Sequence, residues 1–263
     1  MLGTTNKRTD AQIYILGHKP LEYGYLDNQL YTPLQVGAYY KPQFLPITDA
    51  QGDNIGQWNT VFAETTGMYW IAHNAPETLK YVGCCQYRRR ILIVDYADFD
   101  EIFSKCQIIC SEPLHMAISV YQQYCHCHTK AEIDTVKEVI ADLYPEYMDS
   151  WNKFIENGND LIYSSGFVMK TEDFKRYIDF YTSIMFETLK RMGLNTPEEV
   201  QEYAIREMEA GRKPKSNGNG ADKGVIEYQR QIAAFLQERI ATLFIFHNFN
   251  KIAFIPFTKM ENI

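Results

Sequence analysis

Long apolar runs, a secretory leader and a cysteine framework are all missing from this sequence of 263 residues. No apolar stretch approaches the ~18 residues that a membrane-spanning helix needs, and the start, MLGTTNKRTD, lacks the apolar segment of a signal peptide. The six cysteines, at positions 84, 85, 106, 110, 125 and 127, do not have the spacing of a secreted disulfide framework. We interpret them as reduced, mostly core residues and expect a cytoplasmic protein.

A surplus of positive charge is also absent. Lys and Arg number 26 against 33 Asp and Glu, which leaves a formal net charge of −7. Because an acidic surface repels phosphate backbones, this balance argues against general nucleic-acid binding, and any basic site must be local. The 46% of hydrophobic residues is enough for a substantial core, so we expect a globular protein.

The glycine-rich signatures that bind nucleotide phosphates do not occur. The sequence has neither Gly-x-Gly-x-x-Gly nor a Walker motif. A Cys-His-Cys-His run at 125–128 has no second Cys or His pair at zinc-finger distance, which argues against structural zinc. The run Asp98-Phe99-Asp100 fits two interpretations: an Asp-x-Asp that holds a divalent cation against a diphosphate, or a helix N-cap, which we favour.

The strongest local signal that is present is a short apolar strand followed by three arginines. Residues 81–85 (YVGCC) form the predicted strand, and 86–90 (QYRRR) follow it. In open α/β sheets, ligands bind outside the carboxyl ends of strands, and guanidinium groups bind phosphate well. The run therefore predicts a diphosphate site, with a solvated turn as the alternative. The same two interpretations apply to 17–19 (GHK) after a predicted strand at 12–16.

Strand and helix patterns alternate along the chain, which is typical of a parallel sheet. A Tyr-, Pro- and Gly-rich stretch between 21 and 54 predicts an ordered loop, and 211–225 predicts a mobile segment. Thr129 to Glu132 spell a capping box. We expect strands at 12–16, 81–85, 106–110, 161–170 and 252–257, and helices at 59–74, from 129 to about 143, and at 171–193, 197–210 and 227–247.

Several long strings rich in Tyr, Trp, Asn and Arg follow one another in a fixed order. They are IYILGHKP, DNIGQWNTVFAETTGMYWIAHN, YVGCCQYRRR, the segment from His128 to Asp134, YSSGFVMKTEDF and QRQIAAFLQERIATLFIFHN. In these strings the chain resembles a bacterial family called domain of unknown function 4422, associated with capsular and exopolysaccharide biosynthesis and related to GT-A glycosyltransferases. The resemblance covers the chain nearly end to end.

This resemblance implies an α/β fold: a single GT-A-like, Rossmann-like domain over 1–263, with a central, mostly parallel sheet flanked by helices and a helical C-terminal part. Residues 1–120 would form a nucleotide-binding half and 121–263 an acceptor-side half.

The function that the resemblance implies is glycosyl transfer. A sugar, galactose by family analogy, would pass from a nucleotide diphosphate, UDP by the same analogy, to a growing or lipid-linked capsular or exopolysaccharide glycan. The protein would act in the cytoplasm, including at the inner face of the membrane. Two alternatives stay open: a non-catalytic sugar-nucleotide or glycan-binding protein of the same fold, and a Cys/His hydrolase resting on 125–128 alone.

Carried over position by position, the resemblance implies roles for individual residues. The implied donor-binding residues are Gly17, His18, Lys19, Asp53, Asn54, Tyr87, Ser165 and Gly166. Arg88 and Arg89 would neutralise the leaving diphosphate. His128 and Glu238 are candidate catalytic bases, and for Glu238 an ion pair within its helix is the alternative.

The chain departs from the family pattern at the start of this motif. The family's His-Tyr-Arg-Arg begins here with Gln86, whose amide neither titrates nor binds metal at ordinary pH. GT-A enzymes place a metal-binding Asp-x-Asp after the strand that we assign to 81–85, where this chain has Gln-Tyr-Arg-Arg. Whether the protein uses a divalent cation, manganese or magnesium, as a cofactor is thus an open question. The sequence has no convincing Asp-x-Asp site, and we assign no metal ligand. Arg90 lies outside the motif and is expected to face solvent.

Overall fold

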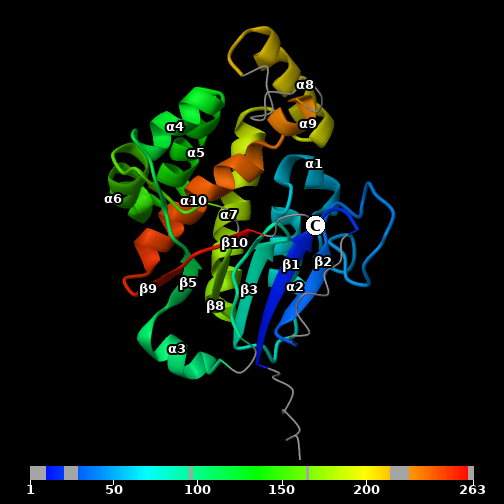
Figure 1. Cartoon of the computed structure of the whole chain (residues 1–263). Helices are drawn as coiled ribbons and strands as arrows, with labels where there is room; N and C mark the ends of the chain where they lie inside the picture. The colour runs from blue at the N-terminus through cyan, green and yellow to red at the C-terminus, as the bar shows by residue number, and fades with distance from the viewer. Residues whose placement is uncertain (1–9, 21–28, 95–96, 164–165, 214–224, 260–263) are drawn as a thin grey trace, which may run out of the picture.

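A mixed sheet of eight strands, covered by helices, forms the centre of the part of the chain that the computed structural model describes (Figure 1), namely residues 10–20, 29–94, 97–163, 166–213 and 225–259. The strands of this sheet are β1 (Ala11–Gly17), β2 (Tyr31–Gln35), β3 (Tyr81–Gln86), β4 (Arg89–Arg90), β5 (Ile108–Ser111), β8 (Phe167–Lys170), β9 (Ile252–Ile255) and β10 (Thr258–Lys259). A separate pair joins β6 (Leu114–His115) to β7 (Asp160–Leu161).

Helices surround this sheet and extend beyond its ends. They are α1 (Asn59–Phe62), α2 (Thr65–Asn74), α3 (Phe99–Lys105), α4 (Val120–Cys127), α5 (Lys130–Leu143), α6 (Met148–Trp151), α7 (Thr171–Arg191), α8 (Pro197–Glu209), α9 (Val225–Gln229) and α10 (Ile232–Asn248). The arrow of β1 points toward the end of the molecule where α1, α8 and α9 lie, whereas α3 lies at the opposite end (Figure 1).

Three neighbouring strands run parallel and end at one edge. β1 pairs in parallel with β2 on one side and with β3 on the other. β8 is antiparallel to β3 and to β5, while β9 is parallel to β5. This arrangement confirms the predicted α/β class with a mostly parallel sheet, and it places the carboxyl ends of β1, β2 and β3 side by side.

The prediction of a loop throughout 21–54 is wrong, because β2 lies within it. β2 pairs with β1 from Ile13 opposite Tyr31 to Gly17 opposite Gln35. Pro33, which lacks a backbone N–H, hides the strand in the sequence. β2 tolerates this proline because β1 is its only strand partner within the described residues, and proline is accepted in edge strands.

The helix predicted at 59–74 is two helices joined by a strained residue. α1 ends at Phe62, and Ala63 takes φ 46° and ψ −129° before α2 begins at Thr65. Ala63 is the only non-glycine residue with positive φ in the described part of the chain. The side-chain amide of Asn59 donates to the Ala63 carbonyl at 2.8 Å, and the Thr66 hydroxyl oxygen lies 3.0 Å from the same carbonyl. These bonds hold the chain in a conformation that a Cβ disfavours.

The predicted capping box at Thr129 is also wrong. The Thr129 side chain makes no cap hydrogen bond, although α5 does begin at Lys130. Glu132 instead turns into the interior, where it accepts a hydrogen bond from the Tyr124 hydroxyl at 2.6 Å and pairs with Lys213 at 2.7 Å.

Other elements differ from the prediction in their bounds. A shorter helix, α4, precedes α5. The strand predicted at 161–170 is divided into β7 and β8, and the helix predicted at 227–247 is divided into α9 and α10.

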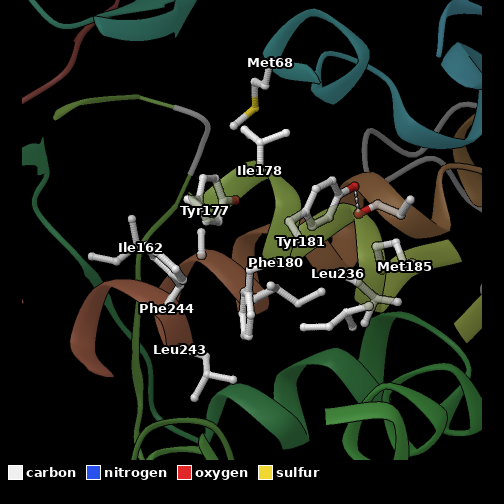
Figure 2. Close-up of a cluster of buried hydrophobic side chains, with 14 of the residues drawn as sticks. Met68, Ile162, Tyr177, Ile178, Phe180, Tyr181, Met185, Leu236, Leu243 and Phe244 are labelled. Atoms are coloured by element: carbon white, nitrogen blue, oxygen red, sulfur yellow. Dashed lines mark hydrogen bonds between the residues drawn. The ribbon is translucent and has the colours of Figure 1, made fainter. Parts of the chain in front are cut away.

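The main core joins α2, α7 and α10 behind the sheet. Tyr177 and Phe180 of α7 lie close to Phe244 of α10, with ring centroids 5.2 and 5.5 Å from that of Phe244 (Figure 2). The Tyr181 hydroxyl donates to Ala233 O at 3.1 Å and lies 3.2 Å from the Thr65 hydroxyl. The first turn of α2, which follows the strained Ala63, is therefore tied to the core.

We expect Ala63→Gly to stabilise the protein by about 1 kcal/mol. Glycine removes most of the strain at positive φ, and the larger loss of backbone entropy when glycine folds offsets only part of that gain. The free energy of unfolding in urea measures the change. Ala141→Gly, at an exposed position within α5, is the matched control and should cost about 0.5–1 kcal/mol. Equal losses in both variants would contradict strain at Ala63.

Candidate functional site

A cavity of about 780 Å³ opens at the carboxyl ends of β1, β2 and β3. This volume lies within the usual range for small-molecule sites, and its place is where ligands bind in open α/β sheets. On the strand side it is lined by Leu16, His18, Val36, Gly37, Lys41, Gln86, Tyr87 and Arg88. α1 and the two residues that join it to α2 add Asn59, Thr60, Ala63 and Glu64, and the opposite wall contains Pro197, Glu198, Gln201, Glu227, Tyr228 and Arg230.

Asp49 fixes the shape of the segment after β2. Its fully buried carboxylate accepts hydrogen bonds from the backbone N–H groups of Gly37 at 2.8 Å and Ala38 at 3.0 Å, and from the Thr66 hydroxyl at 2.5 Å. Gly37 has φ 77°, which favours glycine. Burial raises the pKa of Asp49. Sequence reasoning missed this residue because it lies in the stretch interpreted as loop, where a lone aspartate suggests only a turn.

Three cations gather around His18 and Tyr87. The Lys19 ammonium lies 5.6 Å from the centre of the Tyr87 ring, and the Arg88 guanidinium lies 5.1 Å from it. The His18 ring packs edge-on against the same ring at 5.2 Å, and Lys41 Nζ donates to the His18 carbonyl at 3.4 Å. The structure thus brings together the sequence-predicted His18, Lys19, Tyr87 and Arg88, and it adds Lys41.

The electrostatic potential at this cluster is positive. Partial burial and repulsion from Lys41, Arg88 and Lys19 lower the pKa of His18 to about 4. The imidazole is therefore neutral at pH 7. Such a site favours an anion, and a diphosphate has the required charge. Gly17, at the end of β1, is buried beside this cluster.

The three arginines have three different environments. Arg88 lines the cavity, whereas the Arg89 guanidinium lies 4.6 Å from the centre of the Tyr163 ring and is not among the lining residues. Arg90 is 0% exposed, and its Nε donates to Tyr87 O at 3.2 Å. The expectation that Arg90 faces solvent is wrong, because β4 pairs with both β3 and β10 and its successive side chains point to opposite faces.

Gln86 contacts a carboxylate inside the cavity. Its side-chain amide donates a hydrogen bond to Glu64 Oε1, and both residues line the cavity. Glu64 directly follows the strained Ala63 and is half-buried. The position at which the family usually has histidine is therefore occupied here by a hydrogen-bond donor to an acid.

The predicted donor residues Asp53 and Asn54 do not line the cavity. The Asp53 backbone is bonded at both N–H and C=O by the amide of Asn74, at 3.0 and 2.7 Å, and its carboxylate accepts from the Tyr69 hydroxyl at 3.2 Å. Asn54 accepts from the backbone N–H of Gly56 at 3.1 Å. Both residues hold the loop that leads to α1, as turn residues do.

His128, one of the candidate bases, lies in the interior and is not a lining residue of the cavity. It is 5% exposed, and its ring stacks on Phe235 at a centroid distance of 4.1 Å. Burial, together with repulsion from Lys213 and Arg239, lowers its pKa well below the usual range. A histidine in this environment packs the core and is a weak base.

Glu238, the other candidate base, forms an ion pair with its neighbour in α10. Glu238 Oε2 lies 3.0 Å from the buried Arg239, whose guanidinium also covers the Tyr124 ring at 5.2 Å and donates to the Phe235 carbonyl at 2.8 Å. The ion-pair interpretation of Glu238 is confirmed, and Glu238 is not a lining residue of the cavity.

Gly166 lies close to an aromatic ring of the protein, that of Phe257. A Cβ added there would lie 2.2 Å from Phe257 Cε1, so the glycine makes room for that ring. Gly166 precedes β8, whose Phe167 is opposite Cys84 of β3, and it therefore lies near the same edge of the sheet as Gln86. Ser165 lies outside the described residues.

The Asp-x-Asp at 98–100 lies at the wrong end of β3 for this cavity. Asp98 accepts from the backbone N–H of Glu101 at 3.0 Å, which confirms the N-cap interpretation, and Asp100 accepts from the Tyr81 hydroxyl at 2.7 Å. Since Tyr81 begins β3 and Gln86 ends it, about 16 Å of strand separates the two positions. Within the described ranges, no group of three or more His, Cys, Asp or Glu could hold a metal ion.

A family model now gives this geometry a context. The model of domain of unknown function 4422 (DUF4422) matches residues 12–208, which include every strand-side residue of the cavity. The chain belongs to this family. The match crosses from the predicted nucleotide-binding half into the other half, and the division at 120 stays a prediction.

One solved structure supports the GT-A-like fold. It is titled "WbbM bifunctional glycosytransferase apo structure", and the similarity has a TM-score of 0.63 at 20% sequence identity. It covers 97% of this chain and 46% of that chain, so this chain spans less than half of that protein. At this identity the likeness shows the fold, and the predicted GT-A-like class is confirmed. No curated protein matches the chain. None of the helices described here is long and apolar enough to cross a membrane.

We expect the His18 ring to titrate near pH 4 in the free protein. Added pyrophosphate should raise this pKa, because a bound anion cancels the positive potential and favours the imidazolium. Two-dimensional NMR of the ring nitrogens measures both values, with the exposed His126 on α4 as an internal reference that should not respond. A His18 midpoint near the ordinary value of ~6.5 that pyrophosphate leaves unchanged would contradict the anion site.

Proposed function

We propose that this protein is a glycosyltransferase that moves a sugar from a nucleotide diphosphate donor, UDP-galactose in the first instance, to a growing capsular or exopolysaccharide glycan. The observation that carries the proposal is the gathering of Lys19, Lys41 and Arg88 at the strand ends, in and beside a cavity of about 780 Å³. Family membership and the GT-A-like fold support it.

The cations would act on the leaving group. When the bond from the sugar to the diphosphate breaks, negative charge grows on the phosphate oxygens, and fixed positive groups in a partly dry site stabilise that charge. Arg88 and Lys19, at 5.1 and 5.6 Å from the centre of the Tyr87 ring, are placed for this role. The residues after β3 do not offer the carboxylates of an Asp-x-Asp, and a guanidinium group repels a divalent cation.

The opposite wall suits the neutral part of the donor. α8 and α9 contribute the carboxylates Glu198 and Glu227 and the amide of Gln201, all of which accept hydrogen bonds from hydroxyl groups. We propose that the strand ends bind the diphosphate and that this wall binds sugar and ribose hydroxyls. The nucleotide-binding half would then hold the phosphates and the other half would close the site.

Donor binding is the first test. In a thermal-shift panel of UDP, GDP, CMP and TDP, with and without manganese, we expect UDP to raise the melting temperature, since a ligand at 100 times its Kd adds ~2.7 kcal/mol of stability. Manganese should not change the UDP response, because the proposed cations would neutralise the diphosphate in its place, and the described residues contain no group of three or more His, Cys, Asp or Glu that could hold a metal ion. Stabilisation that requires manganese would contradict the proposed role of the cations.

Arginine substitutions test the leaving-group role. We expect Arg88→Ala to lower the rate of sugar transfer by ~10²-fold or more, as the loss of one group that stabilises developing charge does. Arg89→Ala should have the smaller effect, because Arg89 lies over Tyr163 outside the cavity lining. Lys80→Ala, at the amino end of β3, removes one exposed positive charge and is the control. Equal losses for Arg88→Ala and Lys80→Ala would count against the site.

A non-catalytic nucleotide-sugar or glycan-binding protein is the second candidate. Gln86, in place of the family's histidine, and the remote Asp-x-Asp favour it. A protein that binds UDP-galactose but neither hydrolyses it nor transfers galactose to any glycan acceptor would establish this alternative.

A further inference from the structure

We propose that Glu64 is the catalytic base of the transfer reaction and that Gln86 is the residue that positions it. This assignment rests on the proposed function, because it names the group that takes the proton from the acceptor hydroxyl in the same cavity. Such a group must lie within hydrogen-bond reach of the acceptor, hence inside the cavity. His128 is buried in the core and Glu238 is paired with Arg239, and neither lines the cavity.

Among the carboxylates that line the cavity, Glu64 is the one in a fixed orientation. Glu198 and Glu227 are exposed on the helical wall, whereas Glu64 is half-buried and accepts a hydrogen bond from the Gln86 amide. An amide keeps this bond at any ordinary pH, because it does not titrate. A general base needs such a fixed orientation, because it must be held within hydrogen-bond reach of the proton that it takes.

The backbone aims Glu64 at the strand ends. Ala63, at φ 46°, breaks the helix just before Glu64, so the carboxylate follows a sharp turn instead of continuing along α1. On its other side, Thr65 lies 3.2 Å from the Tyr181 hydroxyl and Thr66 donates to Asp49. Glu64 is thereby held between a strained turn and two buried anchors, as expected where the surrounding structure maintains a strained site.

Glu64 also lies close to the group that would bind the leaving diphosphate. The charges of both Arg88 and Glu64 act on the Tyr87 hydroxyl, with opposite signs. Glu64 and Arg88 also line the same cavity, so a base and a cation both border the space in which displacement at a sugar carbon would take place.

The step balances as a single displacement. The acceptor hydroxyl oxygen forms a bond to the anomeric carbon while the bond from that carbon to the diphosphate oxygen breaks and its electron pair leaves with the diphosphate. Glu64 takes the hydroxyl proton, and Arg88 with Lys19 stabilises the departing charge. Attack from the face opposite the leaving group inverts the anomeric configuration.

Glu64→Gln is the decisive variant, because the amide oxygen can still accept from Gln86 while the group can no longer take a proton. We expect the turnover of UDP-galactose, with water or octyl β-galactoside as acceptor, to fall by about 10²-fold or more, and the Kd for UDP to stay unchanged. Glu101→Gln, an exposed carboxylate on α3, is the matched control with full activity. Full turnover in Glu64→Gln, or loss of UDP binding equal to the loss of turnover, would overturn the assignment.

Gln86 is tested by its own pair of variants. Gln86→Leu should lower kcat by roughly tenfold with little change in KM, because Glu64 loses its orientation. Gln86→His, which restores an N–H donor, should recover kcat. A purely structural role would lower stability in both variants without this recovery, and that result would overturn the positioning role.

The outcomes separate this assignment from the proposed function. If wild-type protein turns over UDP-galactose and Glu64→Gln does so equally well, the base is wrong and the function stands. If wild-type protein neither hydrolyses UDP-galactose nor transfers its sugar to an acceptor, the function and the base fail together. Retention of the anomeric configuration in the product would also overturn the base, because it excludes a single displacement.

Discussion

The parallel pairing of β1 with β3 is the constraint on which the candidate site depends. The pairing runs from Ala11 opposite Tyr81 to Leu16 opposite Gln86, so both strands end at the same level. The residues that follow, His18 and Lys19 from one strand and Tyr87 and Arg88 from the other, must then meet. A shift of this register by one residue would turn their side chains to the other face of the sheet and remove the cluster.

Two further layers hold the remaining cavity residues. The core between α7 and α10 fixes the start of α2 through Tyr181 and Thr65, and Asp49 ties the end of β2 to Thr66. These buried polar contacts position Gly37 and Glu64 without taking part in chemistry themselves. The sheet therefore places positive groups at its edge, and the core places the Glu64 carboxylate near them. A cation that stabilises a leaving diphosphate and a carboxylate that accepts a proton are both useful in displacement at a sugar carbon.

The sequence predicted the parts of this arrangement that depend on local pattern. A short apolar run followed by charged or glycine-containing turns marks β1 and β3, and it places His18, Lys19 and Arg88 at strand ends. Pattern could not reveal β2, because Pro33 removes an N–H and only pairing with β1 shows that an edge strand tolerates it. Asp49 was missed for the same reason, since its role depends on partners in β2 and α2.

The residues that sequence reasoning misplaced are those whose surroundings depend on tertiary packing. His128 and Glu238 have the right chemistry for a base, but whether a residue faces a cavity depends on how the neighbouring helices pack around it. Arg90 is buried because a short C-terminal strand, β10, pairs with β4, a contact between residues far apart in the sequence. The sequence alone does not suggest the role of Glu64, because that role depends on the break in the helix at Ala63 and on the hydrogen bond from Gln86.

A crystal structure of the protein bound to UDP would show where the diphosphate lies. We expect it at the carboxyl ends of β1 and β3, with Arg88 and Lys19 within hydrogen-bond distance of its oxygens and no metal ion between them. A nucleotide bound elsewhere, or a diphosphate held at this edge through a divalent cation on carboxylates, would contradict it.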